Sequence, residues 1–217
     1  MRPASFVVLN VFTLGVVSYA VVVYGFLPLG VAVHPVMRAT FETQRLGIYA
    51  HVFASVFALA LGPFQFSARL RAKHRALHRW AGRLYLGVGV LVGGLAGLFM
   101  ASHAFGGLLS RLGFTGLALG WLYTGSRAYL AIRSRDVVSH RRWMIRNFAL
   151  TFAAVTLRLW LPASMASGIA FELAYPVIAW LCWVPNLVVA ELLFNRPYNK
   201  PLPLADASYA AHRHSDG

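Results

Sequence analysis

Six long apolar runs constrain this chain more than any other feature of its sequence. A helix needs about 20 residues to cross the roughly 30 Å hydrocarbon core of a membrane, and each run is long enough. The runs lie near residues 5–33, 46–66, 82–103, 112–132, 147–170 and 173–194. Backbone groups in lipid must hydrogen-bond within the chain, so each run is expected to be a helix. The sequence predicts an all-α, polytopic transmembrane bundle of about six spans.

The composition agrees with a membrane protein and argues against nucleic-acid binding. The chain is 59% hydrophobic and only 12% charged, which is well below the charged fraction of an ordinary soluble domain. Its formal net charge is +14, but the cations lie in short segments between apolar runs and not in a stripe on a polar domain. We therefore expect the basic segments to contact anionic lipid headgroups.

The basic segments also predict how the chain is oriented. Residues 67–81 and 133–146 hold most of the Arg and Lys, whereas 34–45 and 104–111 hold few. Lys and Arg accumulate in cytoplasmic loops, so the two basic segments and both termini are expected on the cytoplasmic side. The predicted location is the inner membrane of a bacterium, crossed several times.

The chain is expected to form one domain followed by a tail. Residues 1–195 make up the predicted transmembrane bundle, and 196–217 form a polar, flexible C-terminal segment. The boundary between the last two spans is marked only by Gly168, Glu172 and Pro176, so a kinked or re-entrant segment is allowed there.

Four histidines are placed where they could hold a cofactor. His51 and His103 fall toward one face of the membrane, and His78 and His140 precede the third and fifth spans at the other face. One histidine pair near each face is the arrangement that holds two haems by imidazole on both sides of each iron. The sequence therefore suggests bound haem b and electron transfer within the membrane.

Other residues near these histidines fit the same hypothesis. Arg79 and Arg83 lie one helical turn apart and could clamp haem propionates. The third span is rich in glycine, which would let a flat macrocycle or a second helix approach its backbone. The glycines are Gly87, Gly89, Gly93, Gly94 and Gly97.

Arg158 lies near the middle of the fifth span, where an arginine needs a partner or access to water. A propionate or a quinone oxygen could satisfy it, which makes a quinone a candidate partner. A backbone carbonyl is the other choice, with Gln65, Thr151 or Thr156 nearby.

Simpler explanations stay open for each of these features. The histidines and arginines could bind lipid or a partner in a non-catalytic membrane protein, either a small-solute transporter or an assembly factor. His74 and His78 are four residues apart, so they could instead bind a divalent metal. The glycines could serve helix packing, including a homodimer through the third span. No catalytic motif is present that would decide whether the chain is an enzyme.

Three motifs together resemble a known family. They are HVFASVFALALGPFQF, beginning at His51, then HRALHRWAGR, and then HRRWMIR continuing to LRLWLP. The chain resembles, over about residues 45–165, the bacterial predicted membrane proteins called domain of unknown function 2306. This resemblance implies the membrane architecture and no chemistry, and His103 lies outside its motifs. In helix count and paired histidines the chain is also similar to di-haem b-type membrane cytochromes, which implies electron transfer only at the level of the fold.

Overall fold

Every regular element that the structure describes is a helix, as the sequence predicted. The computed structural model describes the backbone of residues 3–195 and the side chains of residues 7–195, so the expected tail at 196–217 lies outside the described residues. The elements are α1 (Pro3–Phe26), η1 (Pro35–Met37), α2 (Arg38–Thr43), α3 (Arg45–Gln65), α4 (Ala68–Lys73), α5 (Arg75–Leu84), η2 (Tyr85–Val92), α6 (Gly93–Ser102), α7 (Gly107–Arg133), α8 (Val137–Thr151), α9 (Ala153–Ala166), α10 (Phe171–Leu181), α11 (Val184–Val189) and η3 (Ala190–Phe194).

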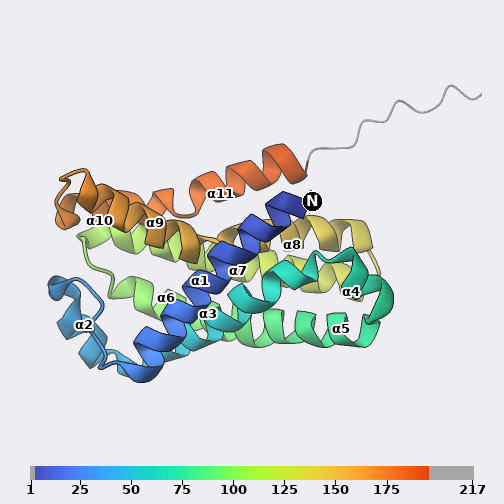
Figure 1. The fold of residues 1–217 in the computed structure, drawn as a ribbon, viewed down its shortest axis with the longest axis horizontal. Coiled ribbons are helices and arrows are strands. Elements are labelled where there is room, and N and C mark those ends of the chain that lie inside the picture. The colour runs from blue at the N-terminus through green and yellow to red at the C-terminus, as the bar shows by residue number, and fades with distance from the viewer. Residues whose placement is uncertain (1–2, 196–217) are drawn as a thin grey trace, which may run out of the picture.

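These helices run back and forth along the long axis of an elongated bundle (Figure 1). The successive passes are α1, α3, α5–η2–α6, α7, α8–α9 and α10–α11–η3. The short helix α2 lies at one end, called here the α2 end, and α4 lies at the other, called the basic end. Five of the passes are long and apolar enough to cross a membrane, which confirms a helical membrane protein.

The pass formed by α7 is long enough to cross a membrane but less apolar than the others. It has 27 residues and includes Arg111, Arg127 and Arg133. It packs against α6, α8 and α10, so protein covers much of its surface and a less apolar composition suffices.

Two segments that the sequence predicted as basic loops are largely helical. Helices α4 and α5 occupy most of 67–81, and α8 occupies most of 133–146. The third and fifth passes therefore begin at Arg75 and Val137, several residues before their predicted starts at 82 and 147. Long basic side chains at a helix end can keep their charges in water. The basic residues in 67–81 and 133–146 therefore did not show where the helices of the third and fifth passes begin.

Side-chain caps explain where two of these helices begin. The Ser67 hydroxyl accepts a hydrogen bond from the Leu70 amide at the start of α4. The Asp136 carboxylate likewise accepts one from the Ser139 amide at the start of α8. Hydrogen bonds from the Ser139 side chain and backbone lower the pKa of Asp136 below its ordinary value.

The turn between the fifth and sixth passes forms where the sequence was ambiguous. Gly168 has φ +75°, a left-handed conformation that favours glycine, and α10 starts three residues later. The break in the sixth pass comes later, at Trp183, whose φ of −130° separates α10 from α11. Pro185, two residues later in the first turn of α11, has no backbone N–H to donate back into α10.

The glycines of the third pass serve helix packing. Added Cβ atoms at Gly89, Gly93 and Gly97, four residues apart, would meet Ala58, Ser55 and His51 of α3. This glycine stripe lets the two antiparallel helices approach closely, as small residues do in membrane bundles. At its tightest point the new Cβ at Gly89 would lie 2.7 Å from the Cβ atom of Ala58.

We expect Gly89→Ala to lower the free energy of unfolding by about 1–3 kcal/mol, because backbone atoms of α3 would have to move. Gly87→Ala is the matched control in the same segment, since nothing lies within 4 Å of its added Cβ. Thermal unfolding of both variants in detergent measures the difference, and equal melting temperatures would show that the close approach contributes little to stability.

Candidate binding site

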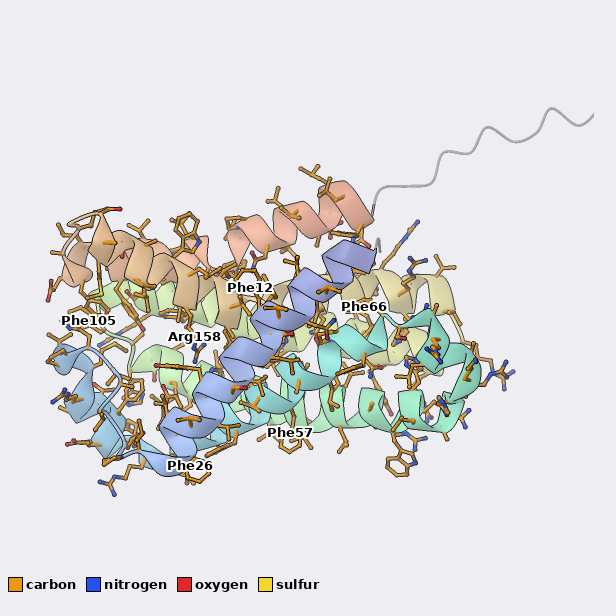
Figure 2. The ribbon with its side chains drawn as sticks, in the orientation of Figure 1. Phe12, Phe26, Phe57, Phe66, Phe105 and Arg158 are labelled. Carbon is orange, nitrogen blue, oxygen red and sulfur yellow. The ribbon has the colours of Figure 1, made fainter. Side chains whose placement is uncertain are left out.

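A cavity of about 260 Å³ lies inside the half of the bundle nearer the α2 end. Helices α1, α3, α6, α7, α9 and α10 surround it, and residues of η1 and α2 border its end. Figure 2 shows Phe105 at this end of the molecule and the Arg158 side chain reaching from α9 into the bundle. The polar and aromatic residues that line it include Tyr24, His51, Ser55, Trp121, Arg158 and Tyr175.

His51 is held firmly against the third pass. Its Nδ1 atom lies 2.8 Å from the carbonyl oxygen of Gly93, which requires that Nδ1 carry the proton and donate. A Cβ at Gly97 would lie 2.8 Å from the same nitrogen, so the imidazole needs the glycine there. The Nε2 atom has no hydrogen-bond partner within the described residues and can accept from a ligand in the cavity.

Arg158 borders the same cavity, and no carboxylate among the described residues pairs with it. Its guanidinium donates to the Ala154 carbonyl at 2.8 Å and lies 5.4 Å from the centre of the Tyr19 ring. It also interacts electrostatically with His51 and Tyr24. A charged group at membrane depth is costly unless something compensates it, and one carbonyl and one ring leave most of its donors free.

A hydrogen-bonded network closes the cavity toward the basic end. Trp121 and Thr151 line the cavity, and the Trp121 indole N–H donates to the Thr151 hydroxyl at 2.9 Å. Behind them the buried Tyr85 hydroxyl lies 2.8 Å from the Asn147 side chain and 2.9 Å from Thr151. The Asn147 amide donates to the Trp121 carbonyl and to Thr124. A buried network with its members paired makes a rigid floor.

His51 and His103, the predicted outer haem pair, have different surroundings in the structure. Both residues line the cavity, but no contact joins their rings in the part of the chain that the structure describes. The Nδ1 atom of His103 contacts Ser102 and the Phe99 carbonyl of its own helix. The cavity volume of about 260 Å³ is close to the roughly 300 Å³ at the lower end of pockets for small ligands.

At the basic end, His78 and His140 are neighbours that interact electrostatically. The Nδ1 atom of His140 lies 2.8 Å from the Ala128 carbonyl, which orients its ring. Ala128 on α7 and Met144, which is one turn after His140 on α8, belong to a buried core cluster. His140 therefore lies beside this core cluster, with its ring oriented by the Ala128 carbonyl.

The other predicted site residues lie on the surface of the basic end. Arg79 is exposed, and the exposed Arg83 guanidinium lies 4.8 Å from the centre of the Trp80 ring. His74 is exposed in the break between α4 and α5, where its backbone is not helical. Among the described residues no group of three or more His, Cys, Asp or Glu could hold a metal ion.

Sequence reasoning identified His51 and Arg158 but missed that they share one cavity. The tyrosines that line it come from passes at the two ends of the chain, Tyr24 from α1 and Tyr175 from α10, and the Tyr19 ring of α1 contacts Arg158. Polar aromatic residues inside predicted spans were the available signal.

Comparison with known proteins places the architecture in a family. The family model described as "Predicted membrane protein (DUF2306)" matches residues 48–194, which is most of the chain and extends beyond the segment that carried the resemblance. No curated protein and no solved structure gives a match.

Proposed function

We propose a function from the cavity of this chain, which belongs to the DUF2306 family of predicted membrane proteins: it binds a small amphipathic molecule with a carboxylate head group. In this proposal Arg158 holds the carboxylate, His51 contacts the head group through Nε2, and the apolar part of the ligand fills the rest of the cavity. The protein would act as a binding protein or carrier, without a covalent step.

The unpaired Arg158 carries this proposal. Arg146–Glu191 is the ion pair found among residues 7–195, so no described carboxylate neutralises Arg158. An arginine inside a membrane protein is a functional candidate by default, and its planar guanidinium matches a carboxylate with two parallel hydrogen bonds. A bound anion would supply the charge that the surrounding helices lack.

The rest of the cavity supports a small, mainly apolar ligand. A single cation with a few hydrogen-bonding groups set in an otherwise apolar lining is how proteins commonly fix the orientation of a small ligand. Phe105 and Tyr175 lie in the aromatic cluster where the loop after α6 meets α10. The polar floor at Trp121 limits how far a ligand can extend toward the basic end.

We expect Arg158→Gln to weaken the binding of radiolabelled decanoate about tenfold or more, since a hydrogen bond to a charged group contributes at least about that factor. Binding would be measured on protein in nanodiscs, with empty nanodiscs subtracted. Arg158→Lys, which keeps the charge but loses the planar fork, should fall between Arg158→Gln and the natural protein.

Arg111→Gln is the control for this experiment. It removes the same charge from an exposed position on α7, away from the cavity lining, and should leave decanoate binding unchanged. Equal binding by the natural protein and a folded Arg158→Gln variant would contradict the proposal. If the protein binds a short-chain quinone in preference to decanoate, the ligand class is a neutral carbonyl compound and the proposed carboxylate is wrong.

Electron transfer through haem b is the competing proposal, and it rests on His78 and His140 being neighbours. Bis-histidine ligation gives a Soret band that shifts on reduction. From protein made with ample haem supply, we expect no such band, because His140 lies against Ala128 and one turn from Met144, which both belong to a buried core cluster. A band that disappears in His140→Ala would contradict this expectation and restore the cytochrome hypothesis.

We further propose that the basic end faces the cytoplasm of a bacterium, because Lys and Arg concentrate there. Ser134 follows the last residue of α7 at the basic end, and Ser102 is the last residue of α6 at the α2 end. Both serines are exposed. The natural Cys182 is buried and gives little background.

A membrane-impermeant thiol reagent applied to cells with a permeable outer membrane should therefore label Ser102→Cys and leave Ser134→Cys unlabelled until the inner membrane is opened. The opposite pattern would reverse the proposed orientation.

A further inference from the structure

A second group of polar side chains lies at the basic end, where α3 ends and α5 begins. Gln65 is only 7% exposed, and its Nε2 atom has no hydrogen-bond partner among the described residues. The Nδ1 atom of His78 is also buried, and it too lacks a partner within that part of the chain. Buried polar groups are almost always paired, so two unpaired atoms on neighbouring helices indicate a missing partner.

The two side chains belong to the same site. The Oε1 atom of Gln65 would lie 3.2 Å from a Cβ at Gly82, which places the amide against α5. Gly82 is one helical turn after His78, on the same face of that helix. The Arg71 guanidinium donates to the backbone carbonyl of Gln65 at 3.1 Å. Arg71 also interacts electrostatically with His78, as does His140.

The charge of this region favours an anion as the missing partner. Residues 66–84 include six Lys and Arg and no Asp or Glu. Elsewhere at this end, Asp136 caps α8 and Glu191 pairs with Arg146. The region therefore offers hydrogen-bond donors and positive charge without an acidic acceptor of its own.

We infer that Gln65, Arg71 and His78 form a binding site for a phosphate group at the basic end, supplied by an anionic lipid headgroup or by a soluble phosphate. The Gln65 amide, the Arg71 guanidinium and the protonated Nδ1 of His78 donate to its oxygens. Charge-assisted hydrogen bonds of this kind are stronger than neutral ones. The site lies at the opposite end from the Arg158 cavity and does not depend on the ligand proposed there.

The test measures the melting temperature of purified, delipidated protein in detergent with three probes: dioleoyl phosphatidic acid, dioleoylglycerol and inorganic phosphate. Phosphatidic acid should raise the melting temperature, and dioleoylglycerol, which lacks only the phosphate, should not. A rise with inorganic phosphate alone identifies a soluble phosphate as sufficient, and no rise with it identifies a lipid headgroup. Equal effects of the two lipids, or no effect of phosphatidic acid, would overturn the inference.

Two sets of variants locate the effect. Arg71→Gln should weaken the apparent affinity for phosphatidic acid about tenfold. Arg69 and Arg71 are both exposed, but among the described residues it is Arg71 that bonds to Gln65. Arg69→Gln removes the same charge from the same helix and should change the affinity little, as expected for a solvated charge. If both variants lose the same affinity for phosphatidic acid, the lipid responds to general surface charge and the proposed site is overturned.

Gln65→Glu keeps the size of the side chain but supplies an internal anion. It should raise the melting temperature without any added phosphate and abolish the response to phosphatidic acid. A Gln65→Glu protein that still responds like the natural one would contradict the site even if other variants fold poorly.

Discussion

The close approach of α3 to the third pass is the contact on which the rest of the structure depends. The glycine stripe at Gly89, Gly93 and Gly97 brings the two backbones together, and van der Waals packing between small residues is the main force that joins helices in lipid. The same contact fixes His51, because its imidazole lies against Gly97 and bonds to the Gly93 carbonyl. The cavity has a rigid wall on this side for that reason.

Two of the arginines of the α8–α9 pass, Arg146 and Arg158, show what is unusual about the cavity. Arg146 is paired with Glu191, which the chain brings from 45 residues away. Within the described residues, Arg158 donates to the Ala154 carbonyl and lies against the Tyr19 ring, and it has no carboxylate partner there. Both lie in one membrane-length segment, so the chain neutralises one cation and leaves the other available for a ligand.

Much of the fold could be predicted from the sequence, because apolar runs of membrane length must be helical in lipid. The sequence also identified His51 and Arg158 as polar residues within these runs, and the structure places both on helices that line the cavity. Their shared cavity did not, since it depends on tyrosines that α1 and α10 bring from opposite ends of the chain.

The haem hypothesis shows what residue type and depth leave open. Histidines at matching depths suggested two pairs, but pairing also depends on rotation about each helix and on the space between the rings. In the structure His103 bonds to its own helix, and His140 lies beside the core cluster that contains Met144. The starts of the third and fifth passes were missed for a related reason, because a basic helix end reads like a loop in the sequence.

The most direct test of the account compares decanoate with decanol as ligands of the natural protein, because the two differ only in the head group that Arg158 is proposed to hold. Thermal unfolding in detergent would be followed with decanoate and with decanol over the same range of ligand concentration. The account predicts that decanoate raises the melting temperature with a saturable dependence and that decanol does not. Equal stabilisation by both would mean that the cavity binds the alkyl chain alone, and it would contradict a role for Arg158 in recognising an anion.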